Sequence, residues 1–218
     1  MPSVYLDTTV LKFAVDRIEG WAPTRKPLSW GWREFIVTVH EPAVAFPNEE
    51  LPNDELKNET RLLPRVAELS RESRIELLMQ QETLIELWGL PRTIDERGLF
   101  YGAPIKKISA PFEYGRVVFE AFADAGALQY DFLSRISDER FVELQKACGA
   151  YQGSKPPSPN QLRDAFHVWC AEAAGADFFL TCDLSLVRYV GRQKRYMPSV
   201  RVVKPSELLV ELVGEVTG

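Results

Sequence analysis

Residues 160–183, NQLRDAFHVWCAEAAGADFFLTCD, carry the strongest fold signal in this sequence. The first part has the composition of a helix, and Gly175 stands where a glycine commonly ends one. The apolar run at 178–181 predicts a short buried strand, and Asp183 lies just beyond it. The stretch therefore predicts a helix that returns directly into a sheet.

The same alternation extends in both directions along the chain. Helices are predicted over 184–190 and from Pro205 to Val213, with a β-branched strand over 200–203 between them. Nearer the start, the predicted strands are Val4–Leu6 and Ile75–Met79, with helices after them over 10–15 and 81–87. Strands that alternate with helices are typical of an α/β protein with a mainly parallel sheet.

Two segments do not fit this alternation, and we predict them to be insertions in a single domain of residues 1–218. The first, about 16–55, is rich in tryptophan and proline and predicts a hairpin or an extended arm. The second, about 91–150, predicts an edge strand at 99–101 or 105–108 and then a helix over 113–148, broken near Gly126 and Ser137. Between them, 55–73 predicts a helix that Pro64 kinks or ends.

Composition excludes several classes of protein. The chain of 218 residues has 26 Lys and Arg against 31 Asp and Glu, a formal net charge of −5. This balance disfavours a protein that coats duplex nucleic acid non-specifically, because such binding depends on many basic contacts to phosphate. Three cysteines without a CxxC pattern predict neither a disulfide framework nor a zinc finger. With no signal-peptide pattern and no long apolar run, we expect a cytoplasmic protein that does not bind membranes.

Acidic residues stand where ligands bind in sheets of this kind. Asp7 and Asp183 directly follow predicted strands, and the carboxyl ends of parallel strands form the binding edge. Asp164 lies in the first turns of the long helix, and Glu86 lies on the helix after the middle strand, where Glu82 is a competing choice. Carboxylates that converge repel one another, and Mg²⁺ or Mn²⁺ would relieve this repulsion. Each acid taken alone also fits a simpler role as a turn, cap or solvated helix residue.

Three segments resemble the PIN-domain family of metal-dependent ribonucleases. They are the opening VYLDTTVL at 4–11, the helix QETLIEL at 81–87, and a closing block over 164–209 that contains DAFH, AEAAGAD, FLTCD and VVKPSELL. The resemblance covers residues 1–15, about 60–90 and about 155–213. It implies a three-layer α/β/α fold that hydrolyses RNA with Mg²⁺ or Mn²⁺.

The resemblance also implies roles for individual residues. It assigns Asp7, Glu86, Asp164 and Asp183 as catalytic metal-binding acids, with Thr181 as a hydroxyl near the metal. Thr9 departs mildly from the Asn or Ser that the family more often has there. The implied partners are RNA, either single-stranded or structured, an antitoxin-like protein, and a second copy of the chain.

Two other functions remain open from the sequence. A haloacid-dehalogenase-type phosphatase also begins with a strand that ends in Asp, but it needs a second acid where Thr9 stands. A non-catalytic nucleic-acid-binding or regulatory module would keep the fold without turnover. His167 fits either a packed helix position or a place beside the acids. Aromatic and basic side chains in the two insertions, such as Trp30, Trp32 and Lys107, fit single-stranded RNA binding or packing.

Overall fold

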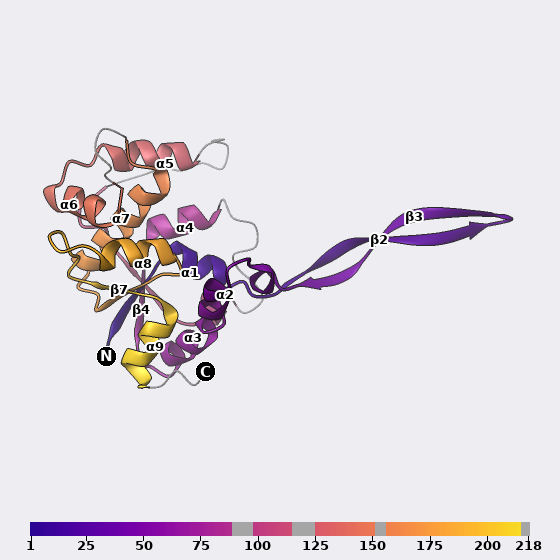
Figure 1. The fold of residues 1–218 in the computed structure, drawn as a ribbon, viewed down its shortest axis with the longest axis horizontal. Coiled ribbons are helices and arrows are strands. Elements are labelled where there is room, and N and C mark those ends of the chain that lie inside the picture. The colour runs from indigo at the N-terminus through magenta and orange to yellow at the C-terminus, as the bar shows by residue number, and fades with distance from the viewer. Residues whose placement is uncertain (89–97, 115–124, 151–155, 215–218) are drawn as a thin grey trace.

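The computed structural model describes residues 1–88, 98–114, 125–150 and 156–214, and over these ranges it shows an α/β protein with one five-stranded sheet and one long hairpin (Figure 1). The strands of the sheet are β1 (Ser3–Leu6), β4 (Glu76–Gln80), β5 (Ile105–Ile108), β6 (Phe178–Leu180) and β7 (Arg201–Val203). Their spatial order is β5-β4-β1-β6-β7, and every pair is parallel. This confirms the predicted parallel α/β sheet.

Helices connect and cover these strands. They are α1 (Thr8–Phe13), α2 (Asp54–Thr60), α3 (Leu63–Arg71), α4 (Gln81–Trp88), α5 (Ala125–Ser134), α6 (Glu139–Ala147), α7 (Pro159–Ala173), α8 (Leu184–Gly191) and α9 (Pro205–Val213). Short 3₁₀ helices form at Pro47–Glu50 and Leu99–Gly102. In the part of the chain that the structure describes, no helix is long and apolar enough to span a membrane.

Alternation along the strands divides the core between the two faces of the sheet. Val4 and Leu6 of β1 point to one face, where they pack with apolar residues of α1, α3 and α9. Tyr5 points to the other face and packs with residues of α5, α6, α7 and α8, and its ring stacks on Phe179 at 5.4 Å between centroids. Because successive side chains of a strand face opposite ways, a buried strand needs a helical layer on each side. The result is the three layers α/β/α.

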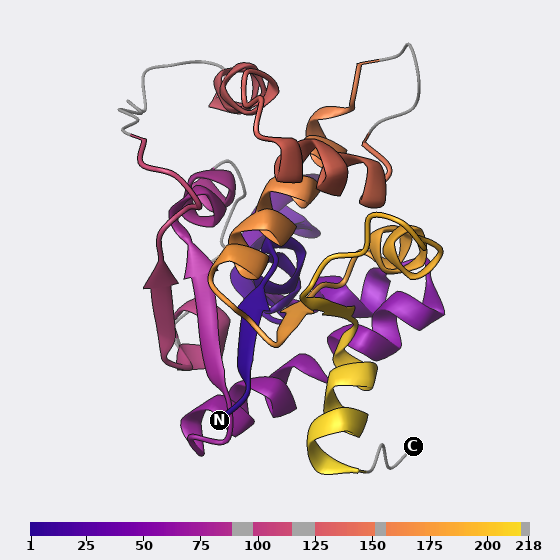
Figure 2. The same cartoon turned by 90° about the vertical axis from the view of Figure 1, so that its left-hand side faces the viewer.

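The second predicted insertion contributes to this layered body. β5 is an edge strand that extends the sheet beside β4, as the 105–108 alternative predicted, whereas 99–101 is 3₁₀ helix. Figure 2 shows the arrowheads of the strands pointing toward the end of the body where α5 and α6 lie. Phe141 of α6 is fully buried in the core and stacks on Trp169 of α7.

Several predicted helix boundaries differ from the structure. The helix over 55–73 is two helices, because the chain turns at residues 61–62 and Pro64 then takes a first-turn position of α3, where a missing N–H costs nothing. The break near Gly126 stays a prediction, because α5 starts at Ala125 and the residues just before it are not described. The break near Ser137 is confirmed, and α6 starts after Asp138, whose side chain accepts a hydrogen bond from the backbone of Phe141. Residues 115–124 lie outside the described ranges.

The first insertion is an antiparallel hairpin of β2 (Ile18–Trp30) and β3 (Arg33–Ala45) that projects from the body (Figure 1). Its two-residue connection starts with Gly31, whose φ of 64° is a conformation that favours glycine. Two strands of 13 residues each span about 40 Å at 3.3 Å per residue. The predicted hairpin or arm is therefore confirmed.

Candidate functional site

The order of the strands places one crevice at the carboxyl edge of the sheet. After β1 the chain adds β4 and then β5 on one side, and it then crosses to the other side of β1 and adds β6 and β7. The direction in which strands are added therefore changes between β1 and β6. Ligands of open α/β sheets bind at such a switch point. Asp7 and Thr181 are the first residues past β1 and β6, and both therefore lie at this crevice.

Asp7 is buried and is held by two threonine hydroxyls. The side chain is 2% exposed, and its Oδ2 accepts a hydrogen bond of 2.7 Å from Thr181 and another from Thr9. Both hydroxyls also accept from backbone, Thr9 from the N–H of Cys182 and Thr181 from the N–H of Asp183. These backbone donors direct the two hydroxyl protons toward Asp7. Burial raises the pKa of the Asp7 carboxyl against the opposing effect of His167 and of the two hydroxyls.

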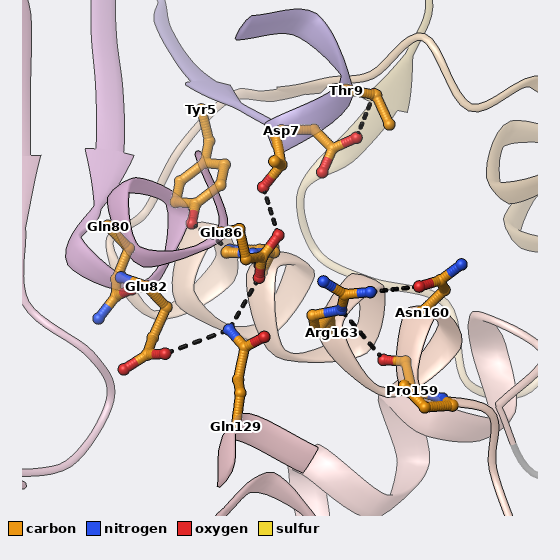
Figure 3. Close-up of polar contacts among 12 residues, drawn as sticks. Tyr5, Asp7, Thr9, Gln80, Glu82, Glu86, Gln129, Pro159, Asn160 and Arg163 are labelled. Carbon is orange, nitrogen blue, oxygen red and sulfur yellow. Dashed lines mark hydrogen bonds and ion pairs between the residues drawn. The ribbon is translucent and has the colours of Figure 1, made fainter. Parts of the chain in front are cut away.

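Glu86 reaches the same place from α4. Its Oε2 accepts a hydrogen bond of 2.6 Å from Thr8, and its Oε1 accepts from Gln129 and from Nε2 of His167, each at 2.9 Å (Figure 3). Burial works to raise the pKa of Glu86, but the charge and hydrogen bond of His167 outweigh it and lower the pKa to about 2. Glu86 is therefore an ionised carboxylate.

His167 is a buried partner of Glu86 and not only a packed helix residue. Its side chain is 1% exposed, and Nδ1 lies 2.8 Å from the hydroxyl of Tyr5. Burial lowers the pKa of the imidazole, but Glu86, Asp7 and Asp164 together raise it above its ordinary value. The pair joins α4, α7 and β1 beneath the crevice.

Asp164 is the acid on which the negative charge of the site acts most strongly. It lies near the start of α7, and no described residue is shown donating a hydrogen bond to its carboxylate. Burial raises the pKa of Asp164, and the charges of Asp7, Asp183 and Glu86 raise it further, to about 8. The charges of the other three predicted acids thus all act on Asp164, although the four acids come from four separate elements.

Asp183 has the capping role that the sequence had left open. Its Oδ1 accepts hydrogen bonds from the backbone of Ser185 at 2.7 Å and of Leu186 at 3.1 Å, and so it caps α8. A cap uses one carboxylate oxygen and fixes the side chain at the carboxyl edge of β6. Its charge still reaches Asp164.

Glu82, the competing choice for the central acid, lies one turn before Glu86 and has different partners. It accepts hydrogen bonds from the hydroxyl of Tyr114 at 3.0 Å and from Gln129 at 3.2 Å. Figure 3 shows Gln129 between the two glutamates, with Glu86 on the side of Asp7. Glu86 rather than Glu82 is therefore the acid grouped with Asp7.

The chemistry of these donors fits a hard divalent cation, because all four acids supply oxygen ligands. As the side chains stand, however, no three His, Cys, Asp or Glu residues in the described ranges form a group that could hold a metal ion. The reason is visible in the contacts: Glu86 is turned to Thr8 and His167, and Asp183 caps α8.

Sequence reasoning missed two contributors to this site. From the sequence, Thr8 or Thr9 is a possible cap of the helix after Asp7, whereas in the structure α1 starts at Thr8 and the Thr8 hydroxyl donates to Glu86. Gln129 gave no signal, because it lies on α5 in a segment predicted to be an insertion. Only the tertiary fold brings Gln129 to the two glutamates of α4.

Comparison of the chain with family models, with curated proteins and with solved structures found no match. The function must therefore be argued from the residues of the site.

Proposed function

We propose that this protein is a divalent-metal-dependent nuclease of the PIN type, which hydrolyses phosphodiester bonds of RNA. The observation that carries the proposal is the convergence of carboxylates from β1, α4, α7 and the end of β6 at the switch point of a parallel sheet. Burial, together with the charges of Asp7, Asp183 and Glu86, raises the pKa of Asp164 to about 8, and a bound cation would favour the ionised carboxylate against both effects.

The proposal gives each acid a place around Mg²⁺ or Mn²⁺. Asp7 and Asp164 would hold the ion, with Asp183 and Glu86 completing its surroundings and Thr181 positioning Asp7. When bound, such an ion activates a water molecule and stabilises negative charge on the phosphoryl group. Thr9 and Thr181 fix the direction of Asp7, and His167 holds Glu86 ionised beside it.

A phosphate substrate needs positive charge beside so acidic a site. Arg163 precedes Asp164 on α7, and its charge contributes to lowering the pKa of Glu86. The guanidinium is bonded only to neutral groups among the contacts shown, the carbonyl of Pro159 and the side chain of Asn160 (Figure 3). We assign Arg163 as a contact for the RNA backbone at the edge of the crevice.

The test is cleavage of a pool of structured and single-stranded RNA in Mn²⁺, in Mg²⁺ and in EDTA. Wild type is compared with Asp164→Asn and with Asp54→Asn, which removes an exposed acid far along the chain from the site. The proposal predicts cleavage that requires the metal, disappears in Asp164→Asn and persists in Asp54→Asn. Equal cleavage by wild type and Asp164→Asn would refute the assignment of the site.

One observation favours a second candidate, a non-catalytic RNA-binding module of the same fold. Glu86 is engaged by His167 and Asp183 by the cap of α8, so these two acids have partners without a metal. This candidate predicts RNA binding that EDTA leaves unchanged and no cleavage in either metal. The same three conditions therefore distinguish the two functions.

A further inference from the structure

The hairpin of β2 and β3 exposes apolar side chains that a water-facing arm does not need. Trp30 is 78% exposed, Trp32 is 85% exposed and Ile36 is 76% exposed. A two-stranded hairpin alone is marginally stable in water, and exposed apolar strands are typical of interaction surfaces. Figure 1 shows the arm extending well beyond the body.

The arrangement of hydrogen bonds in the hairpin follows from its turn. A two-residue connection makes Trp30 and Arg33 a hydrogen-bonded pair, and pairs alternate from there toward the base. The N–H groups at positions 34, 36, 38 and 40 of β3, and at odd positions of β2, therefore point outward. The prolines support this alternation of inward and outward N–H groups independently. Pro23 and Pro27 of β2 and Pro42 of β3 have no N–H, and all three stand at positions where an N–H would point outward.

The two outer edges of the arm consequently differ. Pro23 and Pro27 remove outward donors from the middle of β2 and protect that edge from pairing. On β3 the only proline, Pro42, lies near the base, so the edge from Glu34 to His40 keeps its donors. The arm has one blocked edge and one edge open to a further strand.

We propose that this open edge binds a second copy of the chain, β3 pairing antiparallel with β3 about a two-fold axis through Val37. In this register Val37 of one copy lies opposite Val37 of the other. The hydrogen-bonded pairs are 36 with 38 and 34 with 40, the positions whose N–H groups point outward in both copies. The two hairpins become one four-stranded sheet. The β2 edge of each hairpin, which Pro23 and Pro27 block, lies on the outside of this sheet and pairs with nothing.

The register is chosen by the side chains that it brings opposite one another. Arg33 faces Glu41 of the second copy, and Glu34 faces His40, so acidic and basic groups meet at both ends. Between them Phe35 faces Val39, an aromatic beside a β-branched side chain. Shifting the axis by one residue puts Arg33 opposite Val39 or Ala43 and Glu34 opposite Thr38 or Pro42, which leaves these charges without counterparts.

Charge also favours a second copy over nucleic acid as the occupant. The hairpin from Ile18 to Ala45 has three acidic and three basic side chains, namely Glu19, Glu34, Glu41, Arg25, Lys26 and Arg33. An RNA-binding arm needs a positive surplus to attract phosphate. A balanced strand with opposite charges at matching distances from its centre is instead suited to pair with itself.

The pairing predicts the shape of the dimer. Ala45 at the base lies eight residues from the axis, so the two bases are about 50 Å apart along the sheet at 3.3 Å per residue. The bodies therefore stand at opposite ends and do not collide. Trp32 at each tip comes level with Pro42 of the other copy, which gives this exposed indole an apolar neighbour.

The first experiment compares two proline variants of the full chain by analytical ultracentrifugation. Thr38 and Arg25 are directly opposite each other in the hairpin, but their N–H groups face the open and the blocked edge respectively. Thr38→Pro is expected to make the protein monomeric, and Arg25→Pro is expected to leave the dimer. A monomeric wild type, or a dimer that Thr38→Pro leaves intact, would overturn the proposal.

The second experiment tests the register even if a proline variant folds poorly. Opposite residues of a non-hydrogen-bonded pair lie about 4.5 Å apart between Cα atoms, within disulfide range. Val37→Cys is therefore expected to form a covalent dimer on mild oxidation, whereas Val39→Cys, which faces Phe35, is not. The native cysteines of the described chain are buried and give little background. Equal cross-linking at both positions, or none at 37, would refute the register.

Discussion

Replacement of Asp164 by Asn tests whether burial and the neighbouring acids disfavour a charge at this position. Asn has nearly the same shape but carries no charge, so the substitution removes one carboxylate and leaves the packing of α7. Because the pKa of Asp164 is raised from 3.8 to about 8 in the folded protein, the folded chain must hold a proton there at pH 7 that the unfolded chain releases. We expect Asp164→Asn to be more stable than wild type in the absence of metal.

The expected gain in unfolding free energy follows from the number of pH units between the pKa of Asp164 in the unfolded chain and the pH of the measurement. A group whose pKa is raised on folding contributes full stability below its unfolded value, here 3.8, and loses it as the pH rises toward 8. From 3.8 to pH 7 is about three pH units, and each is worth about 1.4 kcal/mol. Asp164→Asn should therefore exceed wild type in unfolding free energy by about 4 kcal/mol at pH 7 and by only about 1–2 kcal/mol at pH 5.

The assay is urea denaturation in EDTA at both pH values, with Asp54→Asn as the matched control. Asp54 is exposed in the first turn of α2, so its loss should cost less than about 1 kcal/mol and should not produce a pH-dependent gain. An Asp164→Asn protein no more stable than wild type at pH 7, or a gain that does not shrink at pH 5, would refute the claim that burial and the neighbouring acids disfavour the charge on Asp164.

Three further substitutions test the parts of the site and core. Thr181→Val should destabilise the protein by about 1–3 kcal/mol in chemical denaturation, because buried Asp7 loses a hydrogen-bond donor, and Thr181→Ser should restore most of this. Glu86→Gln should abolish metal-dependent RNA cleavage, whereas Glu82→Gln should retain it, since only Glu86 is grouped with Asp7. Phe179→Ala should cost about 3–5 kcal/mol of unfolding free energy, because its ring is fully buried in the sheet.

Each of these expectations has a result that contradicts it. A Thr181→Ser protein as unstable as Thr181→Val would show that the hydroxyl is not the stabilising group. Cleavage lost equally in both glutamate variants would make Gln129, which contacts both, the feature that matters. Phe35→Ala on the arm is the control for Phe179→Ala, and a similar loss of body stability in both would contradict the assignment of the core.

The sheet could be predicted because its signals are local. The run Phe178–Leu180 is apolar at every position, which is typical of a strand covered on both faces. Asp7 after β1 and Asp183 after β6 were predictable for the same reason, because residues that follow the end of a parallel strand lie at the carboxyl edge of the sheet.

The partners of the acids could not be predicted from the sequence. Glu82 and Glu86 are one turn apart on the same helix, so periodicity puts both on one face and does not distinguish them. The distinction depends on Thr8 from α1 and on His167 from α7, which only the folded sheet brings to Glu86. Gln129 is 43 residues from Glu86 along the chain, and nothing local to it indicates the contact.

The measurement that tests the central claim most directly is the binding of Mn²⁺, followed by electron paramagnetic resonance. Wild type, Asp7→Asn, Asp164→Asn and Asp54→Asn are titrated with Mn²⁺ under identical conditions. If the convergent acids are a cation site, wild type and Asp54→Asn remove free Mn²⁺ from solution, and the other two variants do so much more weakly. Mn²⁺ binding that is absent in wild type, or unchanged in Asp7→Asn and Asp164→Asn, would contradict the account.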